Sequence, residues 1–226
     1  MTTGPAGKVP GVGARFLRTE IEPFLRSKKF TRRREAFGKW VAMNCGVVQF
    51  LPGRLTERER CDFEVDIGVF NRRIFEFDTV LNPTAKVPVL PEVVDCHWRK
   101  PLYWAIPGLL PDFLPIRSKI PFQDQGLQVR SAFESRVLPL LDQAMTDEGF
   151  KDFLMREWRE RGMWGSGGLS GFELLNLAVL LAELGPMDQL VMVVDALHKE
   201  LAEMPHATLA MRRLARIHEL RPGLMD

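Results

Sequence analysis

Along this chain, the spacing at which apolar residues recur changes once, from every second residue to about every 3.6 residues. In residues 61–70, CDFEVDIGVF, apolar side chains alternate with acidic ones or with glycine. This alternation predicts a strand of an antiparallel sheet with one buried face. From Gln123 onward, apolar residues recur every three or four positions, which predicts helices. The sequence therefore indicates an α+β fold, in which an antiparallel sheet precedes an all-helical C-terminal region.

Other segments add elements before residue 123. Residues 14–29 have apolar side chains at helical spacing and predict an amphipathic helix with a kink at Pro23. Two strands are predicted in residues 36–53, joined by a hairpin turn near residues 44–46, and a fourth short strand in residues 72–80. Residues 82–121 are expected to be mostly loop, with a strand near residues 93–99. We thus expect the N-terminal helix to pack on a sheet of four or five strands.

The last hundred residues predict helices that glycine and proline separate. The first two span residues 126–145 and 146–161, with Thr146 or Asp147 as the N-cap of the second and Gly162 as its stop. Three more are predicted at residues 172–184, 187–203 and 206–220. The expected organisation is a flexible N-terminal segment (1–14), an α+β domain (15–145) and a helical C-terminal extension (146–226).

Composition predicts a globular protein without a membrane segment. Of the 226 residues, 46% are hydrophobic and 27% charged, which permits a sizeable core and argues against disorder. The longest apolar run, residues 174–182, is far below the roughly 20 residues that a bilayer crossing needs. The first 16 residues lack the apolar core of a signal peptide, and three widely spaced cysteines (Cys45, Cys61, Cys96) fit reduced thiols. We therefore expect a cytoplasmic location.

Positive charge is concentrated near the N-terminus, although the net charge is only +2. The basic run consists of Arg26, Lys28, Lys29, Arg32, Arg33 and Arg34. One hypothesis is a surface for nucleic acid or another anion. The hypothesis that we favour is a solvated junction, where a helix ends with cations at the negative end of its dipole and a strand begins.

Residues 95–99, DCHWR, group several reactive side chains. Cys96 and His97 are the candidates for nucleophilic catalysis, which needs both side chains within hydrogen-bond reach. Adjacent strand residues point to opposite faces, and no CxxC or HxxxH partner accompanies them, so we expect neither a metal nor another cofactor. The structural interpretation, which we favour, has Cys96 and Trp98 packed inward and His97 and Arg99 outward.

Two further patterns have chemical alternatives. Asp62, Glu64 and Asp66 lie on one strand face, about 7 Å apart, which suits a cation or acid–base chemistry. We favour a surface on which they pair with residues 32–34 or Lys39. The glycine-rich segment 162–171 precedes a helix but lacks the Gly-Lys-Ser/Thr of a P-loop and the GxGxxG spacing, so it predicts an interhelical loop.

The order of several short motifs carries a family resemblance. The positions are Phe30, Phe37, Val47 to Gln49 with Phe50, Phe63 to Gly68, and Cys96 to Arg99 with Asp112. Over about residues 15–145, this succession resembles the bacterial domain-of-unknown-function family 4304. It departs from the family pattern at Lys29, where glycine is usual, and at Asp66, where asparagine is usual. The resemblance implies an α+β architecture with a basic helix-to-strand junction, and it supplies no catalytic set or cofactor.

Three classes of function follow from these observations. We favour a non-catalytic protein-interaction module of the regulatory or toxin-immunity type in the bacterial cytoplasm, whose partner is another protein or a second copy. It predicts an exposed apolar or charged patch. The second class is a nucleic-acid or anion binder through residues 26–34, which predicts that these cations converge with Lys39 and Arg54. The third is an enzyme that uses segment 95–99, which predicts a pocket with perturbed pKa values.

Overall fold

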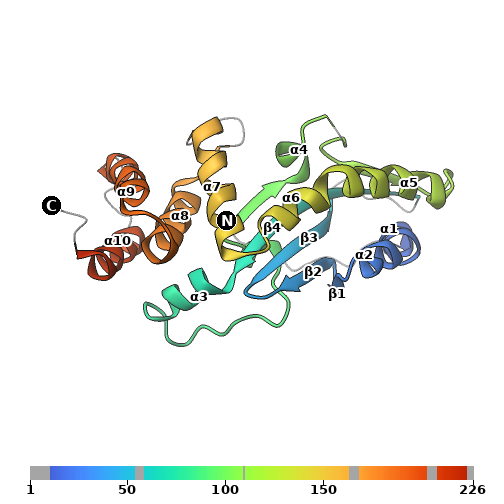
Figure 1. The fold of residues 1–226 in the computed structure, drawn as a ribbon. Helices are drawn as coiled ribbons and strands as arrows, with labels where there is room; N and C mark the ends of the chain where they lie inside the picture. Colours follow the sequence, from blue (N-terminus) through green and yellow to red (C-terminus); the bar gives the residue numbers. More distant parts are fainter. Residues whose placement is uncertain (1–10, 54–58, 109, 163–167, 203–207, 223–226) are drawn as a thin grey trace.

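The computed structural model describes residues 11–53, 59–108, 110–162, 168–202 and 208–222. Figure 1 shows an antiparallel sheet with helices over one face and a group of C-terminal helices beside it. The predicted α+β class and the helical C-terminal region are thus confirmed. Most of the predicted flexible segment 1–14, Arg54 and the centre of the glycine-rich loop lie outside the described residues.

The sheet has six strands in the described residues. They are β1 (Thr31–Arg33), β2 (Ala36–Val41), β3 (Asn44–Pro52), β4 (Arg60–Asn71), β5 (Trp98–Pro101) and β6 (Leu114–Arg117). The strand order is β1-β2-β3-β4-β5, and β6 also pairs with β4. The strand predicted from alternation is β4, whose first residues pair with β6 and whose later residues pair with β5.

Two long helical segments cover one face of the sheet (Figure 1). The first consists of α1 (Gly11–Phe16), η1 (Leu17–Ile21) and α2 (Glu22–Ser27), and the second of α5 (Phe122–Ala132), η3 (Phe133–Val137) and α6 (Leu138–Gln143). Both η1 and η3 are π-helical, and each ends two residues before a proline, Pro23 or Pro139. Because proline has no N–H and clashes with the carbonyl four residues earlier, the wider turn accommodates it. The predicted irregularity at Pro23 therefore takes the form of a π-helical turn.

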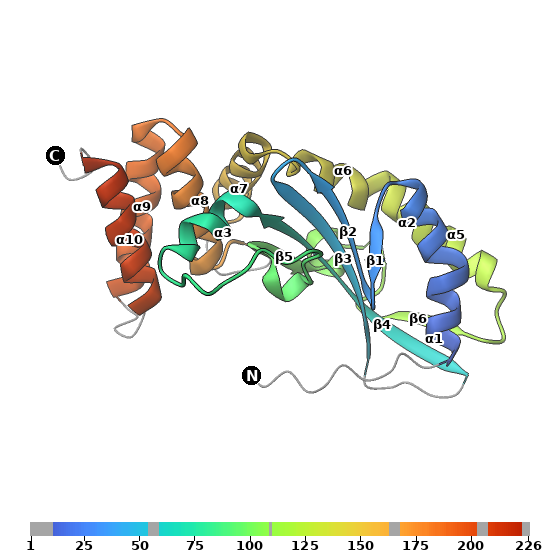
Figure 2. The ribbon, with the colours of Figure 1, turned by 90° about the horizontal axis from the view of Figure 1, so that it is seen from below.

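The chain between β4 and β5 covers part of the opposite face of the sheet (Figure 2). It begins with α3 (Arg72–Thr79), in the segment for which we predicted a strand. That prediction was wrong because Asn71 caps a helix here: its side chain accepts a hydrogen bond from the Ile74 N–H at 2.8 Å. Ile74 and Phe77, about one helical turn apart, are both buried. A smaller core cluster lies on this face and consists of Cys45, Val47, Phe70, Leu90, Val93 and Cys96.

Two other local predictions differ from the structure. The β2–β3 turn lies at Ala42 and Met43 rather than at residues 44–46, because Asn44 pairs with Val41 and its side chain is buried. The Asn44 amide donates to the Ala144 carbonyl at 2.9 Å, which ties β3 to the end of α6. Residues 82–121 contain more structure than predicted, namely η2 (Val93–Asp95), β5, α4 (Leu102–Ala105) and β6.

The C-terminal helices are α7 (Asp147–Arg161), α8 (Gly171–Leu184), α9 (Met187–Ala202) and α10 (Thr208–Leu220). As predicted, Thr146 caps α7, and Gly162 ends it with a φ of 68°. Helix α8 is buried and contacts α3, α7, α9 and α10. One hydrophobic cluster runs from the sheet to α10, so both parts of the chain contribute to the same core. None of the helices in the described ranges combines the length and the apolar character that crossing a bilayer requires.

The two edges of the sheet are protected in different ways. β1 is only three residues long and contains Arg32 and Arg33, and a short, charged edge strand discourages pairing with other chains. The outer edge of β5 is covered by side chains of α8. Asn176 Nδ2 donates to the His97 carbonyl at 2.6 Å, and Glu173 Oε1 accepts from the Arg99 N–H at 3.4 Å.

Replacing Gly68 in β4 by alanine is expected to lower the free energy of unfolding by about 1–3 kcal/mol. A Cβ at this position would lie 2.8 Å from Cβ and Sγ of Cys96 and 2.9 Å from the Trp98 carbonyl oxygen. Urea unfolding followed by circular dichroism measures the change. Gly11→Ala is the control, because its added Cβ meets nothing within 4 Å. Equal free energies of unfolding for the two variants would show that β4 and the segment before β5 are packed less closely than these distances indicate.

Candidate functional site

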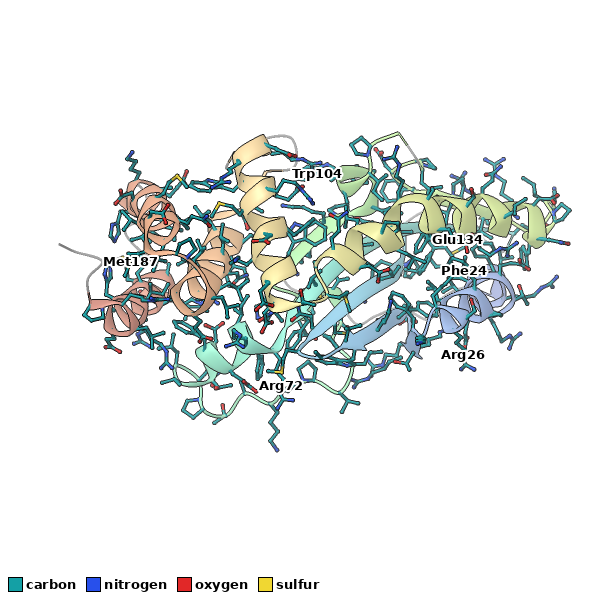
Figure 3. All side chains as sticks on the ribbon, viewed as in Figure 1. Phe24, Arg26, Arg72, Trp104, Glu134 and Met187 are labelled. Carbon is teal, nitrogen blue, oxygen red and sulfur yellow. The ribbon has the colours of Figure 1, made fainter. Side chains whose placement is uncertain are left out.

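The basic run lies at a helix-to-strand junction, between α2 and β1. Its ion pairs join Arg26 and Arg32 to Glu22, Lys28 to Glu134, and Arg34 to Glu92. Figure 3 labels Arg26 on α2 and Glu134 on the adjoining η3 turn. Lys29 and Arg33 are exposed and make no ion pair with a described residue. Three carboxylates pair with four of the six cations, because Arg26 and Arg32 share Glu22. The run is therefore a weaker attractor of phosphate than its sequence indicates.

Cys96 and His97 are buried in different surroundings. Cys96 belongs to the smaller core cluster, where its Sγ lies 3.5 Å from the Glu92 carbonyl oxygen, and burial raises the thiol pKa well above its ordinary value. His97 Nδ1 accepts a hydrogen bond from the Asn71 N–H at 3.0 Å. Burial, assisted by the charge of Arg213, lowers the His97 pKa to about 3. A neutral thiol and a neutral imidazole without a hydrogen bond between them do not form a nucleophilic pair.

The prediction that His97 points outward was wrong, because the residue is buried, with only 5% of its surface exposed. β5 begins at Trp98, so strand alternation does not extend to His97. The carbonyl of His97 is bound by α8, which brings that helix over the residue. The other three placements in the segment are as expected: Cys96 and Trp98 are buried and Arg99 is exposed.

His97 lines a cleft of about 470 Å³ between the start of β5 and the start of α8, which we call the edge cleft. Its lining residues are Val94, Cys96, His97, Arg99, Lys100, Ser170, Phe172 and Glu173. Because Nδ1 of His97 accepts a hydrogen bond, the proton of the neutral ring is on Nε2. Nε2 donates to no described residue, so a buried residue contributes an unused donor to this cleft.

A buried ion pair neutralises most of the charge of the edge cleft. Lys100 Nζ lies 3.0 Å from Glu173 Oε2 and donates to the Gly168 carbonyl at 2.9 Å. The same Glu173 oxygen accepts from the backbone N–H and the hydroxyl of Ser170, which completes the N-terminal cap of α8. Arg99 makes no ion pair with a described residue, and its charge acts at longer range on Asp66, whose pKa burial raises and Arg99 partly lowers. Arg99 is therefore the lining cation to which a ligand anion could bind.

A larger cleft of about 660 Å³ lies between α7, the η3–α6 segment and the chain after α4; we call it the arginine cleft. Its lining residues are Ala105, Ile106, Pro107, Gly108, Ser135, Arg136, Pro139, Leu140, Gln143, Arg156, Glu157, Glu160 and Arg161. Arg161 pairs with the buried Glu157 at 3.3 Å, and burial raises the Glu157 pKa. Arg156 donates to Gln143 at 3.0 Å, and neither Arg156 nor Arg136 has an acidic partner among the described residues.

An exposed tryptophan lies next to the arginine cleft. Trp104 belongs to α4, directly precedes the lining residue Ala105 and is 44% exposed (labelled in Figure 3). A third cavity, between α2 and α5, contains Arg130 and Glu134, which are already paired with Glu20 and Lys28. The arginine cleft therefore contains two guanidinium groups without an ion pair to a described residue, and an exposed tryptophan precedes its lining segment 105–108.

The acidic stripe on β4 does not pair as predicted. Asp62 binds Arg60 of the same strand at 2.7 Å, whereas Arg32 and Lys39 bind acidic residues on helices. The reason is the strand order, because β1 and β2 are not neighbours of β4. Burial and the neighbouring Glu64 raise the Asp66 pKa to about 6, and its buried Oδ1 has no hydrogen-bond partner. Nowhere in the described ranges do three His, Cys, Asp or Glu side chains form a group that could hold a metal ion.

Sequence reasoning missed most residues of both clefts. Arg136, Arg156 and Glu157 are ordinary charged residues of helices, and nothing in their spacing indicates a common cleft. Asn176 could have been noticed in the sequence, because it is the one polar residue in the apolar run LLNLAVLLA. A polar residue in a buried helix usually has a specific partner.

No protein-family model matches the chain, and no curated protein or solved structure shows significant similarity to it. The resemblance to family 4304 therefore stays a prediction from the order of motifs. Functional inference depends on the two clefts themselves.

Proposed function

We propose that this chain is a non-catalytic protein-interaction module of the regulatory or toxin-immunity type in the bacterial cytoplasm, and that the arginine cleft is its binding surface. The principal support is the pair Arg136 and Arg156, which have no acidic partner among the described residues and lie beside the apolar wall of Ile106 and Leu140. Arginine and aromatic residues are enriched in protein interfaces, where they supply much of the binding energy.

The charge of the arginine cleft favours an acidic partner. It contains three arginines and two glutamates, and one glutamate, Glu157, is already paired with Arg161. Carboxylates of a partner would bind Arg136 and Arg156, and the exposed Trp104 of α4 would pack against an apolar side chain of the same partner. The partner is therefore expected to present an acidic segment with an apolar anchor.

The two alternative functions have weaker support. An enzyme that uses segment 95–99 would need a reactive pair, but the Cys96 thiol and the His97 imidazole are both neutral and have separate partners. A nucleic-acid surface at residues 26–34 would need free cations, but most of these form ion pairs. The three cysteines are buried and free, which agrees with the proposed cytoplasmic location.

The double variant Arg136→Glu/Arg156→Glu is expected to weaken partner binding at least tenfold, because it places like charges opposite an acidic partner. The tagged full chain is purified from its native cytoplasm with nuclease, at low and high salt. The stoichiometric partner is then identified by mass spectrometry, purified and titrated by calorimetry. Absorbance spectra of the eluate report bound nucleic acid.

The matched control is Arg33→Glu/Arg212→Glu, which reverses two exposed charges that have no described ion pair. This variant is expected to retain the partner. Equal binding by both double variants would rule out the arginine cleft as the interface. Nucleic acid in the eluate that is released by salt, without a protein partner, would instead support the second function.

A further inference from the structure

The edge cleft has the features of a small-ligand site that is separate from the proposed protein interface. We propose that it binds an apolar monocarboxylate, whose carboxylate contacts Arg99 and the Nε2–H of His97 and whose apolar body packs on Phe172 and Val94. All four residues line this cleft, and its volume of about 470 Å³ lies in the range of small-molecule sites. The proposal does not depend on the function of the arginine cleft.

The balance of charge selects a ligand with one negative charge. Lys100 and Glu173 form an ion pair at 3.0 Å, with 9% and 6% of their side chains exposed, so together they contribute no net charge. Arg99 contributes the remaining positive charge. A carboxylate neutralises it, whereas a phosphate dianion would leave one negative charge beside Glu173, and an uncompensated charge in a partly buried site is costly.

His97 supplies a hydrogen-bond donor whose direction is fixed. Its Nδ1 is held by the Asn71 N–H and its carbonyl by Asn176, so two bonds orient the residue. Nε2–H has no partner among the described residues, and the residue is only 5% exposed and lines the cleft. The donor therefore faces the cleft, where a ligand oxygen can accept its hydrogen bond.

The apolar side chains of the edge cleft are already in position before a ligand binds. Phe172 and Val94 are exposed large hydrophobic residues, and both line the cleft. The guanidinium of the buried Arg213 lies 5.1 Å from the centre of the Phe172 ring, which holds this ring in place. A ring or short alkyl chain on the ligand would bury both side chains, and prior ordering of the site reduces the entropic cost of binding.

Calorimetric titration of the full chain with phenylacetate, benzoate and hexanoate tests the proposal. At least one of these acids is expected to bind at least ten times more tightly than two reference compounds. Benzyl alcohol lacks the negative charge, and phenyl phosphate carries two negative charges near pH 8. Arg99→Gln is expected to lower the affinity for that acid at least tenfold. Arg33→Gln, which removes an exposed cation elsewhere, is expected to leave it unchanged.

Two further readouts separate this proposal from a nonspecific effect of charge. Phe172→Ala is expected to weaken binding of the acid while retaining its preference over the phosphate. His97→Phe removes the Nε2–H donor and is expected to weaken binding of the acid at least tenfold, while Arg99 stays in place. The proposal would be overturned if none of the three acids bound at 10 mM, or if the Arg99→Gln and Arg33→Gln variants bound the acid with equal affinity. Neither result would bear on the proposed protein interface at the arginine cleft.

Discussion

Replacing Asp78 by alanine is expected to lower the free energy of unfolding by about 3–5 kcal/mol. Both oxygens of this carboxylate accept from one guanidinium: Arg213 Nε lies 2.7 Å from Oδ1, and Nη2 lies 2.8 Å from Oδ2. Arg213 is only 1% exposed, and its Nη1 already lacks a partner. Without Asp78, the guanidinium would stay buried with Asn176 as its remaining hydrogen-bond partner, at 2.9 Å. The penalty arises from that buried charge.

Urea unfolding at pH 7, followed by circular dichroism, measures this effect. Asp195→Ala is the matched control, because Asp195 is exposed on α9 and has no ion pair among the described residues; we expect a change below about 0.5 kcal/mol. The double variant Asp78→Ala/Arg213→Met removes both charges and is expected to recover part of the loss. A loss below about 1 kcal/mol for Asp78→Ala alone would mean that Arg213 reaches water in solution.

The second large effect is a dependence of stability on pH that involves two groups with opposite signs. The His97 pKa falls from 6.5 to about 3 on folding, so between these values the unfolded chain binds more protons and stability falls as the pH falls. The Asp66 pKa rises from 3.8 to about 6, so between these values the folded chain binds more protons and stability rises as the pH falls. The two groups therefore oppose each other in the window from about pH 6 to 4.

Single variants separate these contributions. At 1.36 kcal/mol per pH unit, His97 alone is expected to remove about 2–3 kcal/mol between pH 6.5 and 4.5. Asp66 offsets about 1 kcal/mol of this loss, after allowance for its partial exposure to solvent. Asp66→Asn is thus expected to steepen the acid loss and His97→Gln to flatten it. Urea unfolding at several pH values tests both; parallel curves for the two variants and the wild type would contradict the pKa assignments.

The elements that the sequence predicts well are those with strong local signals. β4 follows from strict alternation, and α7 follows from the cap at Thr146 and the stop at Gly162. α3 was missed because RRIFEFDTV fits a short strand as well as a helix, and the cap that decides between them, Asn71, lies just before it. Local pattern therefore fails where one capping hydrogen bond selects the element.

The candidate site was less predictable because its contacts join distant parts of the chain. His97 was identified as a chemically able residue, but its surroundings depend on Asn71 and Asn176, which are 26 and 79 residues away. Lys100 and Glu173 are separated by 73 residues and show no pattern that pairs them. Periodicity shows which face of an element is buried, but it does not show which polar groups meet across elements.

The edge of β5 is covered by a helix that is synthesised later than the strand itself. Glu173, which binds the edge of this strand, follows Lys100 by 73 residues, so the strand leaves the ribosome well before the helix that covers it. During that interval, its outer backbone groups have no partner within the chain, and an open strand edge is a template for other chains. We therefore expect a nascent or truncated chain that ends near residue 145 to aggregate more readily than the full chain. The protection by α8 begins only once that helix has been synthesised.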